Sequence, residues 1–513
     1  MKNLKKTLAM ISSVVMAGSM FAACGNDTTP ATDSAADTTT AAADAAADDT
    51  AAADDAAADD TAAADDTAAA DTAADGDKLT VLCWNTDDID PMLALFCEKT
   101  GHSKDEFNVK SFGCGGGEAA ENYDAYLADA SNDADIMFVE ADWALKYIND
   151  DDATKPLSDI GFTDADYADL YDYTLEIGKS TSGVQKGLSW QAAAGGFCYR
   201  EDLAEKYLNV TTPDDFQALV SDWDKFVDTA AKVKDASNGG TALTSTMGGV
   251  WQVFSAARKT PWVVDNKLQL DDECKKFIDL AKSMYDNGYV VKDLAQWSTD
   301  WYAAGQTDST MGYFVSTWGF GNSILTQAAG GEGGATYGKW KVVVGPQPFY
   351  WGGTWATVAT RCNNPELAKE FISFFTSDAD TARAYAESKG EFVSNKKAME
   401  GILADGTYAG EGVLGGQNQF EVLNDVAAQI DMAGGITEYD STIHAFLLPF
   451  FLSDDPSGLQ TQVPLQSLHT VPAESSHPAP VLTMFLPETG HDIPEYPLSL
   501  LHPEFLPPMH LFR

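Results

Sequence analysis

The chain has 513 residues and a formal net charge of −46, with 78 Asp and Glu against 32 Lys and Arg. So acidic a chain, without a basic patch, excludes nucleic acid as an expected partner. Its seven cysteines include no Cys-x-x-Cys pair, and no histidine stands at metal-ligand spacing, so we expect neither a metal nor a cofactor. Cys83 and Cys97 are compatible with a disulfide or with buried free thiols.

The first 24 residues have the organisation of a bacterial export signal. A basic start precedes an apolar run over residues 8–21, which is too short for a membrane span, and two alanines stand directly before Cys24. The segment resembles the lipobox of lipoproteins, with Phe21 in place of the usual Leu. The resemblance implies a diacylated Cys24 that anchors the protein at the outer face of the cytoplasmic membrane. The alternative is a plain secretory signal with an incidental cysteine.

Residues 25–77 form a low-complexity segment. Between Asp27 and Asp77 the chain is almost entirely Ala, Asp and Thr, with 15 Asp and no Lys or Arg. Such a segment has nothing large to bury and repels itself, so we expect a disordered linker. As a flexible coil it would span roughly 40 Å, enough to hold a folded domain clear of a membrane surface.

The folded part begins near Lys78, where the pattern becomes that of an α/β protein. Residues 79–84 form a short apolar run that predicts a buried strand, and residues 92–97 predict a helix after it. Further buried strands are predicted at residues 136–139, 313–315 and 342–344, with helical patterns between them.

Three helices carry clear start or stop signals. Thr212 supplies an N-cap and Pro213 a first-turn proline for a helix whose apolar face is formed by Phe216, Leu219, Val220, Trp223, Val227 and Ala230. A second helix is predicted to begin at Pro365, and a third over residues 274–285, ended by Asn-Gly. Residues 78–443 are too many for one core, so two α/β lobes are expected.

Five segments carry a resemblance to a known family. They are residues 135–142 (DIMFVEAD), 187–190 (GLSW), 197–203 (FCYREDL), 352–355 (GGTW) and 364–371 (NPELAKEF). In this order they resemble the extracellular solute-binding proteins of carbohydrate ABC importers, solute-binding protein family 1, to which maltose-binding protein belongs. The resemblance implies a two-lobed periplasmic-binding-protein-like α/β fold with a hinge and a ligand cleft. It also implies a monomeric, non-enzymatic component that captures a sugar or oligosaccharide and delivers it to a membrane permease.

This fold divides the chain into lobes that each use two segments. We expect lobe I to comprise about residues 78–190 and 352–393, and lobe II about residues 191–351 and 394–446. Residues 447–513 do not fit the family. After residue 443 the chain has no Lys but 12 of the 20 Pro and 6 of the 7 His, which predicts a disordered or out-of-frame tail. The alternative is a genuine Pro-rich extension.

The tryptophans support a sugar-binding cleft independently. The chain has twelve, and six lie within about sixty residues: Trp297, Trp301, Trp318, Trp340, Trp351 and Trp355. Pyranose rings present flat C–H faces that pack on aromatic rings, while their hydroxyls need polar side chains in fixed places. Clustered Trp and abundant carboxylates supply both, although many of these Trp are also candidates for the core.

The resemblance assigns individual binding residues. Asp142 matches an acid that accepts sugar hydroxyls, Tyr199 an aromatic residue of the second lobe, and Trp318 a sugar-stacking aromatic residue. Val139 stands where the family has an aromatic residue, which leaves the identity of the sugar open. Further candidates at expected strand ends and loops are Trp84, Asp87, Glu140, Trp190, Trp251, Trp355 and Gln417.

Two other functions remain open at this stage. An exported glycoside hydrolase would also combine Trp with paired carboxylates, and Asp87 with Asp88, or Glu140 with Asp142, would be such a pair. Adjacent acids are also common in solvated loops, and no independent catalytic signature accompanies them. A surface binder of peptides or polyamines is the second alternative, since an acidic cleft suits cations.

The first prediction concerns anchoring. Cys24→Ala should release the protein into the medium, because an acidic chain is repelled by anionic lipid and only acyl chains would hold it there. Membrane fractionation of cells expressing each form measures this. An unchanged membrane fraction for the variant would refute lipidation as the anchor.

Overall fold

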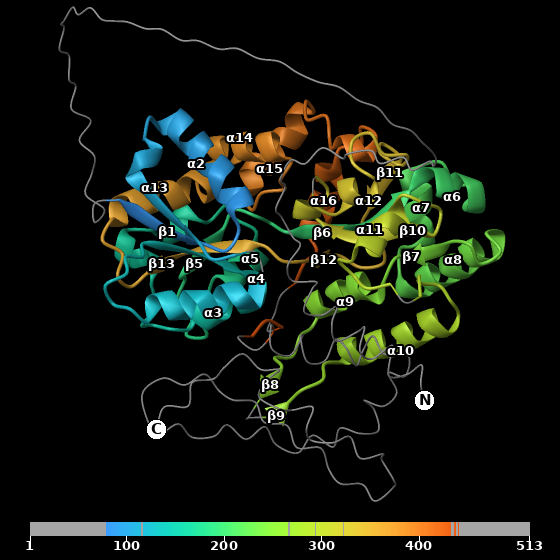
Figure 1. Ribbon diagram of the computed structural model, residues 1–513, viewed down its shortest axis with the longest axis horizontal. Coiled ribbons are helices and arrows are strands. Elements are labelled where there is room, and N and C mark those ends of the chain that lie inside the picture. Colours follow the sequence, from blue (N-terminus) through green and yellow to red (C-terminus); the bar gives the residue numbers. More distant parts are fainter. Residues whose placement is uncertain are drawn as a thin grey trace, which may run out of the picture.

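The computed structural model describes residues 78–440, apart from residues 114–115, 265–266, 293, 322, 432–434 and 438–439. The predicted export signal with Cys24, the linker and the Pro-rich tail lie outside the described residues. Within them, the chain forms two α/β lobes side by side, each built on its own sheet (Figure 1). This is the two-lobed periplasmic-binding-protein fold.

Lobe I contains a six-stranded sheet in the order β2-β1-β3-β13-β4, with β5 paired to β13. Its strands are β1 (Leu79–Cys83), β2 (Phe107–Ser111), β3 (Ile136–Glu140), β4 (Thr154–Lys155), β5 (Gly187–Ser189) and β13 (Thr354–Ala359). Strands β1, β2 and β3 are parallel, whereas β13 returns antiparallel to β3. All five residues of β1 are buried, as expected for a strand covered on both faces.

Helices cover both faces of the lobe I sheet. They are α2 (Thr86–Thr100), α3 (Gly116–Leu127), α4 (Ala141–Ile148), α5 (Asp172–Ile177), α13 (Pro365–Thr376) and α14 (Ala379–Lys389), with 3-10 turns η2 (Lys104–Glu106), η3 (Leu157–Ile160) and η4 (Asp164–Asp166). Helices α2 and α13 lie on one side of the sheet and α3 and α4 on the other (Figure 1). The ring of Phe96 on α2 packs edge-on against Phe371 and Phe374 of α13, so the predicted apolar face of that helix is in the core.

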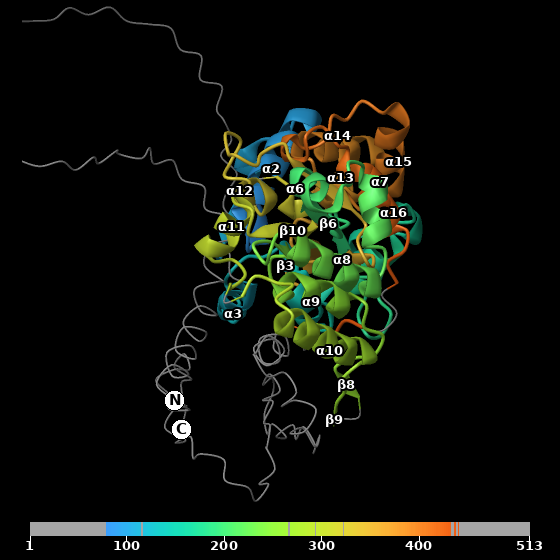
Figure 2. The same ribbon diagram turned by 90° about the vertical axis from the view of Figure 1, so that its right-hand side faces the viewer.

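Lobe II contains a five-stranded sheet in the order β11-β6-β10-β7, with β12 paired to β6. Its strands are β6 (Ala194–Arg200), β7 (Ala242–Thr244), β10 (Thr310–Ser316), β11 (Trp340–Val343) and β12 (Phe349–Tyr350), and a separate hairpin joins β8 (Val263–Val264) to β9 (Lys267–Leu268). The hairpin extends beyond the helices of this lobe in both views (Figure 1, Figure 2). Strands β6 and β10 are antiparallel and buried along their whole length.

The helices of lobe II differ at one place from those predicted from the sequence. They are α6 (Glu201–Leu208), α7 (Pro213–Leu219), α8 (Trp223–Ala236), α9 (Met247–Ala256), α10 (Asp272–Asp286), α11 (Thr299–Gly305), α12 (Leu325–Ala328), α15 (Lys396–Asp405) and α16 (Gln419–Ala427), with η5 (Thr317–Gly319) and η6 (Gly412–Leu414). Helix α15 packs against α16 and also contacts α14 of lobe I. The single helix predicted from Thr212 onward was wrong, because α7 and α8 are separate. Val220 leaves the helical conformation, and the Asp222 carboxylate accepts a hydrogen bond from Lys225 N at 2.8 Å and caps a new helix.

Three segments cross between the lobes and are hydrogen-bonded to one another. They are residues 190–194 between β5 and β6, residues 351–353 between β12 and β13, and residues 390–395 between α14 and α15. Backbone bonds join the first segment to the third and to the second. Gln191 connects all three, since its Oε1 accepts from Thr354 N at 3.0 Å and its Nε2 donates to Glu391 Oε2 at 3.4 Å.

One buried carboxylate ties the centre of lobe I together. Asp135, which precedes β3 and is 1% exposed, accepts a hydrogen bond from Thr80 N at 2.7 Å. Its second oxygen accepts from Asn363 N at 2.8 Å and Asn364 N at 3.1 Å, at the start of α13. A short carboxylate side chain therefore fixes β1, β3 and the loop before α13 relative to one another.

The second prediction concerns this carboxylate. Asp135→Ala should lower the free energy of unfolding by about 2–4 kcal/mol, because three backbone N–H groups lose a charged acceptor. Chemical denaturation measures it. The matched control is Asp228→Ala, on the exposed side of α8, which should stay within about 0.5 kcal/mol of the wild type. Equal stabilities of the two variants would contradict this account.

Candidate functional site

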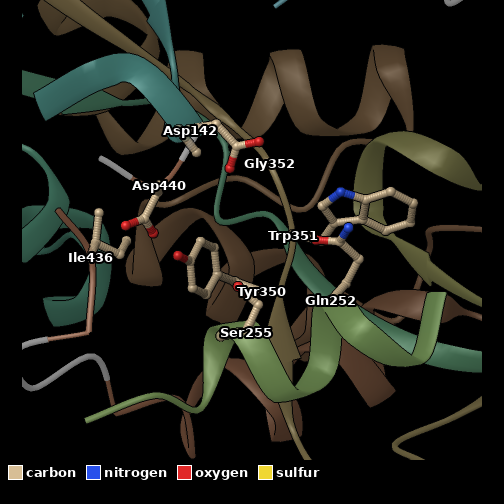
Figure 3. Close-up of a pocket in the computed structure, with 10 residues that line it drawn as sticks. Asp142, Gln252, Ser255, Tyr350, Trp351, Gly352, Ile436 and Asp440 are labelled. Carbon is tan, nitrogen blue, oxygen red and sulfur yellow. The ribbon is translucent and has the colours of Figure 1, made fainter. Parts of the chain in front are cut away.

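A pocket lies where the two lobes and the crossing segments meet. Its walls come from the start of α4 in lobe I, from α9 in lobe II, from the crossing segment after β12 and from the end of the described chain. The lining residues are Ala141, Asp142, Gln252, Ser255, Ala256, Tyr350, Trp351, Gly352, Ile436 and Asp440, around a small space that opens to solvent (Figure 3). Its position between two lobes is that of a ligand site closed by domain movement.

Two carboxylates stand at the lobe I side of this pocket. Glu140 ends β3 and caps α4, its Oε2 accepting from Asp142 N at 2.9 Å. The Asp142 side chain is accessible from the cleft while protein atoms surround it, and this partial desolvation raises its pKa to about 6, opposed by the positive charge of Arg258. Burial and the neighbouring Asp142 raise the pKa of Glu140 well above its ordinary value. Hydrogen-bond donors of a bound ligand would stabilise the ionised forms of both carboxylates.

Three tryptophans pack together beside these carboxylates. The rings of Trp318 and Trp297 are stacked with centroids 6.2 Å apart, and Trp351 meets Trp318 edge-on at 5.0 Å. Trp318 Nε1 donates to the Trp351 carbonyl oxygen at 2.8 Å. Gly352 lies between the aromatic cluster and the acid: a Cβ built on it would be 3.2 Å from Trp318 Nε1 and 3.6 Å from Glu140 Oε1. All three rings remain half-buried, which leaves part of each available to a ligand.

The backbone of Trp297 is unusual. Its φ is 70°, a left-handed conformation that a non-Gly residue adopts at a cost of about 1 kcal/mol or more. Such conformations persist where surrounding structure imposes them, and they concentrate at ligand sites. The strain therefore adds to the case that this cluster is functional.

The structure brings only part of the predicted site together. Asp142 lines the pocket, and Glu140 and Trp318 lie next to it. Trp84 is half-buried where β1 ends. Asp87 lies in the first turn of α2, and its side chain is outside the described residues.

Other predicted site residues have their side chains in packed surroundings instead. Tyr199 is 1% exposed and stacks on Phe216 with ring centroids 3.7 Å apart. Trp355 Nε1 donates to the Thr174 carbonyl oxygen at 2.8 Å inside lobe I. The remaining three follow the same pattern: Trp190 and Trp251 are each 1% exposed, and the Gln417 amide pairs with the backbone N–H and C=O of Val342 on β11. The structure does not place these five side chains in the pocket.

Several residues that line the pocket were not predicted from the sequence. Gln252 and Ser255 lie on α9, whose apolar sequence indicates only a buried helix, and Asp440 lies in a region without a pattern. Tyr350 carried a usable signal, because it precedes a Gly-Gly pair. Gly352 and Gly353 have φ values of 68° and 105°, and such a pair marks a special backbone path between lobes.

Glu391, in the third crossing segment, is a third carboxylate with a raised pKa. It is 6% exposed, and its Oε1 has no hydrogen-bond partner among the described residues. Burial, together with the negative charge of Asp88, raises the pKa of Glu391 to about 8. Folding therefore holds this side chain in its neutral form near pH 7.

The third prediction follows from this pKa. Since the ordinary value is 4.5 and the folded value about 8, the unfolded state releases the proton first. Wild-type stability should therefore fall from pH 4.5 to pH 8, by up to about 1.4 kcal/mol per pH unit. Glu391→Gln should match the wild type near pH 4.5 and exceed its stability by about 2–4 kcal/mol at pH 8. Thermal unfolding across this range measures it, with exposed Glu366→Gln as the control. Parallel pH profiles for wild type and Glu391→Gln would contradict it.

Other kinds of site are not indicated within residues 78–440 as described. That part of the chain holds no group of three or more His, Cys, Asp or Glu arranged to bind a metal ion. None of its helices is both long and apolar enough to cross a bilayer. The Cys83 thiol donates to the Asn85 carbonyl oxygen at 2.5 Å and does not bridge to Cys97.

Comparison with known proteins identifies the family. A family model for bacterial extracellular solute-binding proteins matches residues 91–405, more than half of the chain. The chain therefore belongs to the bacterial extracellular solute-binding proteins, as the five segments predicted. These proteins are the solute-capturing components of transport systems. No curated protein sequence matches the chain.

Solved structures agree with this fold. An extracellular solute-binding protein of family 1 is similar with a TM-score of 0.63 and 19% identity, over 74% of this chain and 94% of that one. An ABC transporter-associated binding protein from B. animalis subsp. lactis, in complex with β-1,6-galactobiose, has a TM-score of 0.56 and 20% identity, over 72% and 91%. UgpB from Mycobacterium tuberculosis, in complex with glycerophosphocholine, has a TM-score of 0.55 and 12% identity, over 75% and 95%.

Proposed function

We propose that the protein is the substrate-binding component of an ABC importer and captures a sugar or oligosaccharide in the pocket between its lobes. The observation that carries this is the meeting of two acceptor carboxylates, Glu140 and Asp142, with the aromatic cluster of Trp297, Trp318 and Trp351. Sugars need both at once, since their ring faces are apolar and their edges are hydroxyls.

Each part of the site has a separate role in this proposal. Trp318 provides the stacking face, and its Nε1 bond to the Trp351 carbonyl oxygen holds the ring in one orientation. Asp142, accessible from the cleft, accepts hydroxyl hydrogen bonds. Glu140 is partly occupied in capping α4, so it supports the position of Asp142 as well as the charge of the site. Closure of the lobes about the crossing segments would then remove the sugar from water.

A small cationic solute is the second candidate, because ammonium groups also bind next to carboxylates and over indole faces. One structure of this fold, UgpB, holds a choline compound. A thermal-shift screen with neutral sugars, polyamines and choline esters separates the two, since only a bound ligand raises the unfolding temperature. A glycoside hydrolase is less well supported, because the Glu140 carboxylate is engaged in capping α4. Release of reducing sugar from glycans would revive it.

The proposal includes the cellular setting expected from the sequence. Cys24 would carry the lipid anchor, and the acidic linker would let the two lobes reach a permease in the same membrane. The protein would act as a monomer, without a cofactor. Its localisation would be the outer face of the cytoplasmic membrane.

The fourth prediction tests the proposed contacts. With the first saccharide that raises the unfolding temperature, Trp318→Ala should weaken binding by about 2–4 kcal/mol, roughly 30- to 1,000-fold, because stacking area and ring orientation are lost. Asp142→Ala should cost about 1.5–3 kcal/mol, because a charged acceptor leaves a desolvated site. Isothermal calorimetry measures both.

The control is Tyr207→Ala, which removes an aromatic ring on α6 that contacts Lys206 on the surface of lobe II. Its affinity should equal that of the wild type. Near-normal affinity in the Trp318 variant would remove the aromatic cluster from the site. A polyamine that binds while every saccharide fails would establish the second candidate instead.

A further inference from the structure

A buried ion pair stands behind the wall of the pocket opposite Asp142. Arg258 follows α9, and its Nη2 lies 2.6 Å from Asp440 Oδ2, with the two side chains 1% and 6% exposed. The guanidinium also stacks over the Trp262 ring at 4.0 Å, and its Nε donates to the Ser255 carbonyl oxygen at 3.2 Å. Its Nη1 is buried without a hydrogen-bond partner among the described residues.

This ion pair fastens the end of the described chain to lobe II. Asp440 Oδ1 accepts from Thr437 N at 3.0 Å and Thr437 Oγ1 at 2.8 Å, so the carboxylate also shapes its own turn. The backbone of Gly435 lies so close to the backbone of Arg258 that a Cβ on Gly435 would be 2.3 Å from the Arg258 carbonyl oxygen. Ile436 and Asp440 line the pocket as a result.

The same pair also acts on the charge of the pocket. Figure 3 shows the Asp440 carboxylate and the Tyr350 hydroxyl turned toward each other, with the Asp142 carboxylate on the same space. Burial raises the pKa of both Asp142 and Tyr350, and the positive charge of Arg258 opposes each increase. Asp440, Asp142 and Glu140 add to the increase at Tyr350. On α10, burial raises the pKa of Cys274 to about 12; Arg258 opposes this increase and Asp271 adds to it.

We propose that Arg258 and Asp440 are positioning residues of the ligand site. Their ion pair holds Ile436 and Asp440 as the third wall of the pocket. Arg258 favours the ionised, hydrogen-bond-accepting form of Asp142, and Asp440 limits that effect by neutralising it. This inference rests on the proposed function for its ligand, but the state of Asp142 is measurable without one.

Substitutions of the two residues should therefore shift the pKa of Asp142 in opposite directions. Arg258→Met removes the nearby cation and should raise the pH midpoint of Asp142 by about half a unit or more; Asp440→Asn exposes Asp142 to the full charge of Arg258 and should lower it. The double variant should return near the wild type. Carboxyl-carbon NMR of the ligand-free full chain measures the midpoint, with the resonance assigned from Asp142→Asn. If the ion pair had a purely structural role, both single substitutions would shift the pH midpoint of Asp142 in the same direction.

Ligand affinity provides the second readout. With a saccharide found by thermal shift, Arg258→Met should weaken binding more at pH 5.5 than at pH 8, because more of Asp142 is protonated at the lower pH in the variant. The difference should be at most roughly tenfold, which is the change in affinity that follows from raising one pKa by one unit. The control is Lys259→Met, which breaks an exposed pair with Asp431 beside the same segment and should keep the wild-type pH profile.

The double variant guards against misfolding, because it leaves no buried charge unpaired. Asp142 midpoints that are unchanged, or that move in the same direction in both single variants, would overturn the proposal. Absence of any bound saccharide would overturn the proposed function, while the NMR titration would still decide this inference.

Discussion

The hydrogen bonds among the three crossing segments are the constraint on which the rest of the molecule depends. Gln191 accepts from Thr354 N and donates to Glu391, so one side chain joins all three paths between the lobes. Any ligand site between the lobes must lie beside this junction. The backbone there adopts conformations that ordinary residues avoid, at Ala193 with φ 49° as well as at the Gly-Gly pair. A connection of this kind permits bending between two rigid sheets.

The second consequence is electrostatic. The pocket is lined by the carboxylates of Asp142 and Asp440, and the buried cation Arg258 is already paired with Asp440. Partial desolvation raises the pKa of Asp142 to about 6, so this group is mostly ionised near pH 7 while it remains accessible from the cleft. It is therefore suited to accept hydrogen bonds from neutral hydroxyls or charged amines, and it disfavours anionic ligands. Aromatic rings on the other side supply the apolar surface.

Much of the architecture could be predicted, because local signals and burial agree there. The start at Pro365 and the phenylalanine stripe of α13 are examples, and Asp142, which the family resemblance assigned, lines the pocket. Tyr199 was not distinguishable from a ligand residue, because aromatic side chains serve cores and clefts equally well. Asp440 could not be predicted at all: its role depends on a contact with Arg258, 182 positions away, which no local pattern encodes.

The central claim is that a solute binds between the lobes and draws them together about the crossing segments. X-ray scattering of the full chain, with and without a saturating saccharide identified by thermal shift, tests this most directly. The account predicts that the ligand lowers the radius of gyration of the wild type. At the same ligand concentration, the radius of gyration of Trp318→Ala should not change. Binding confirmed by calorimetry with an unchanged radius of gyration would contradict closure, and with it the proposed site between the lobes.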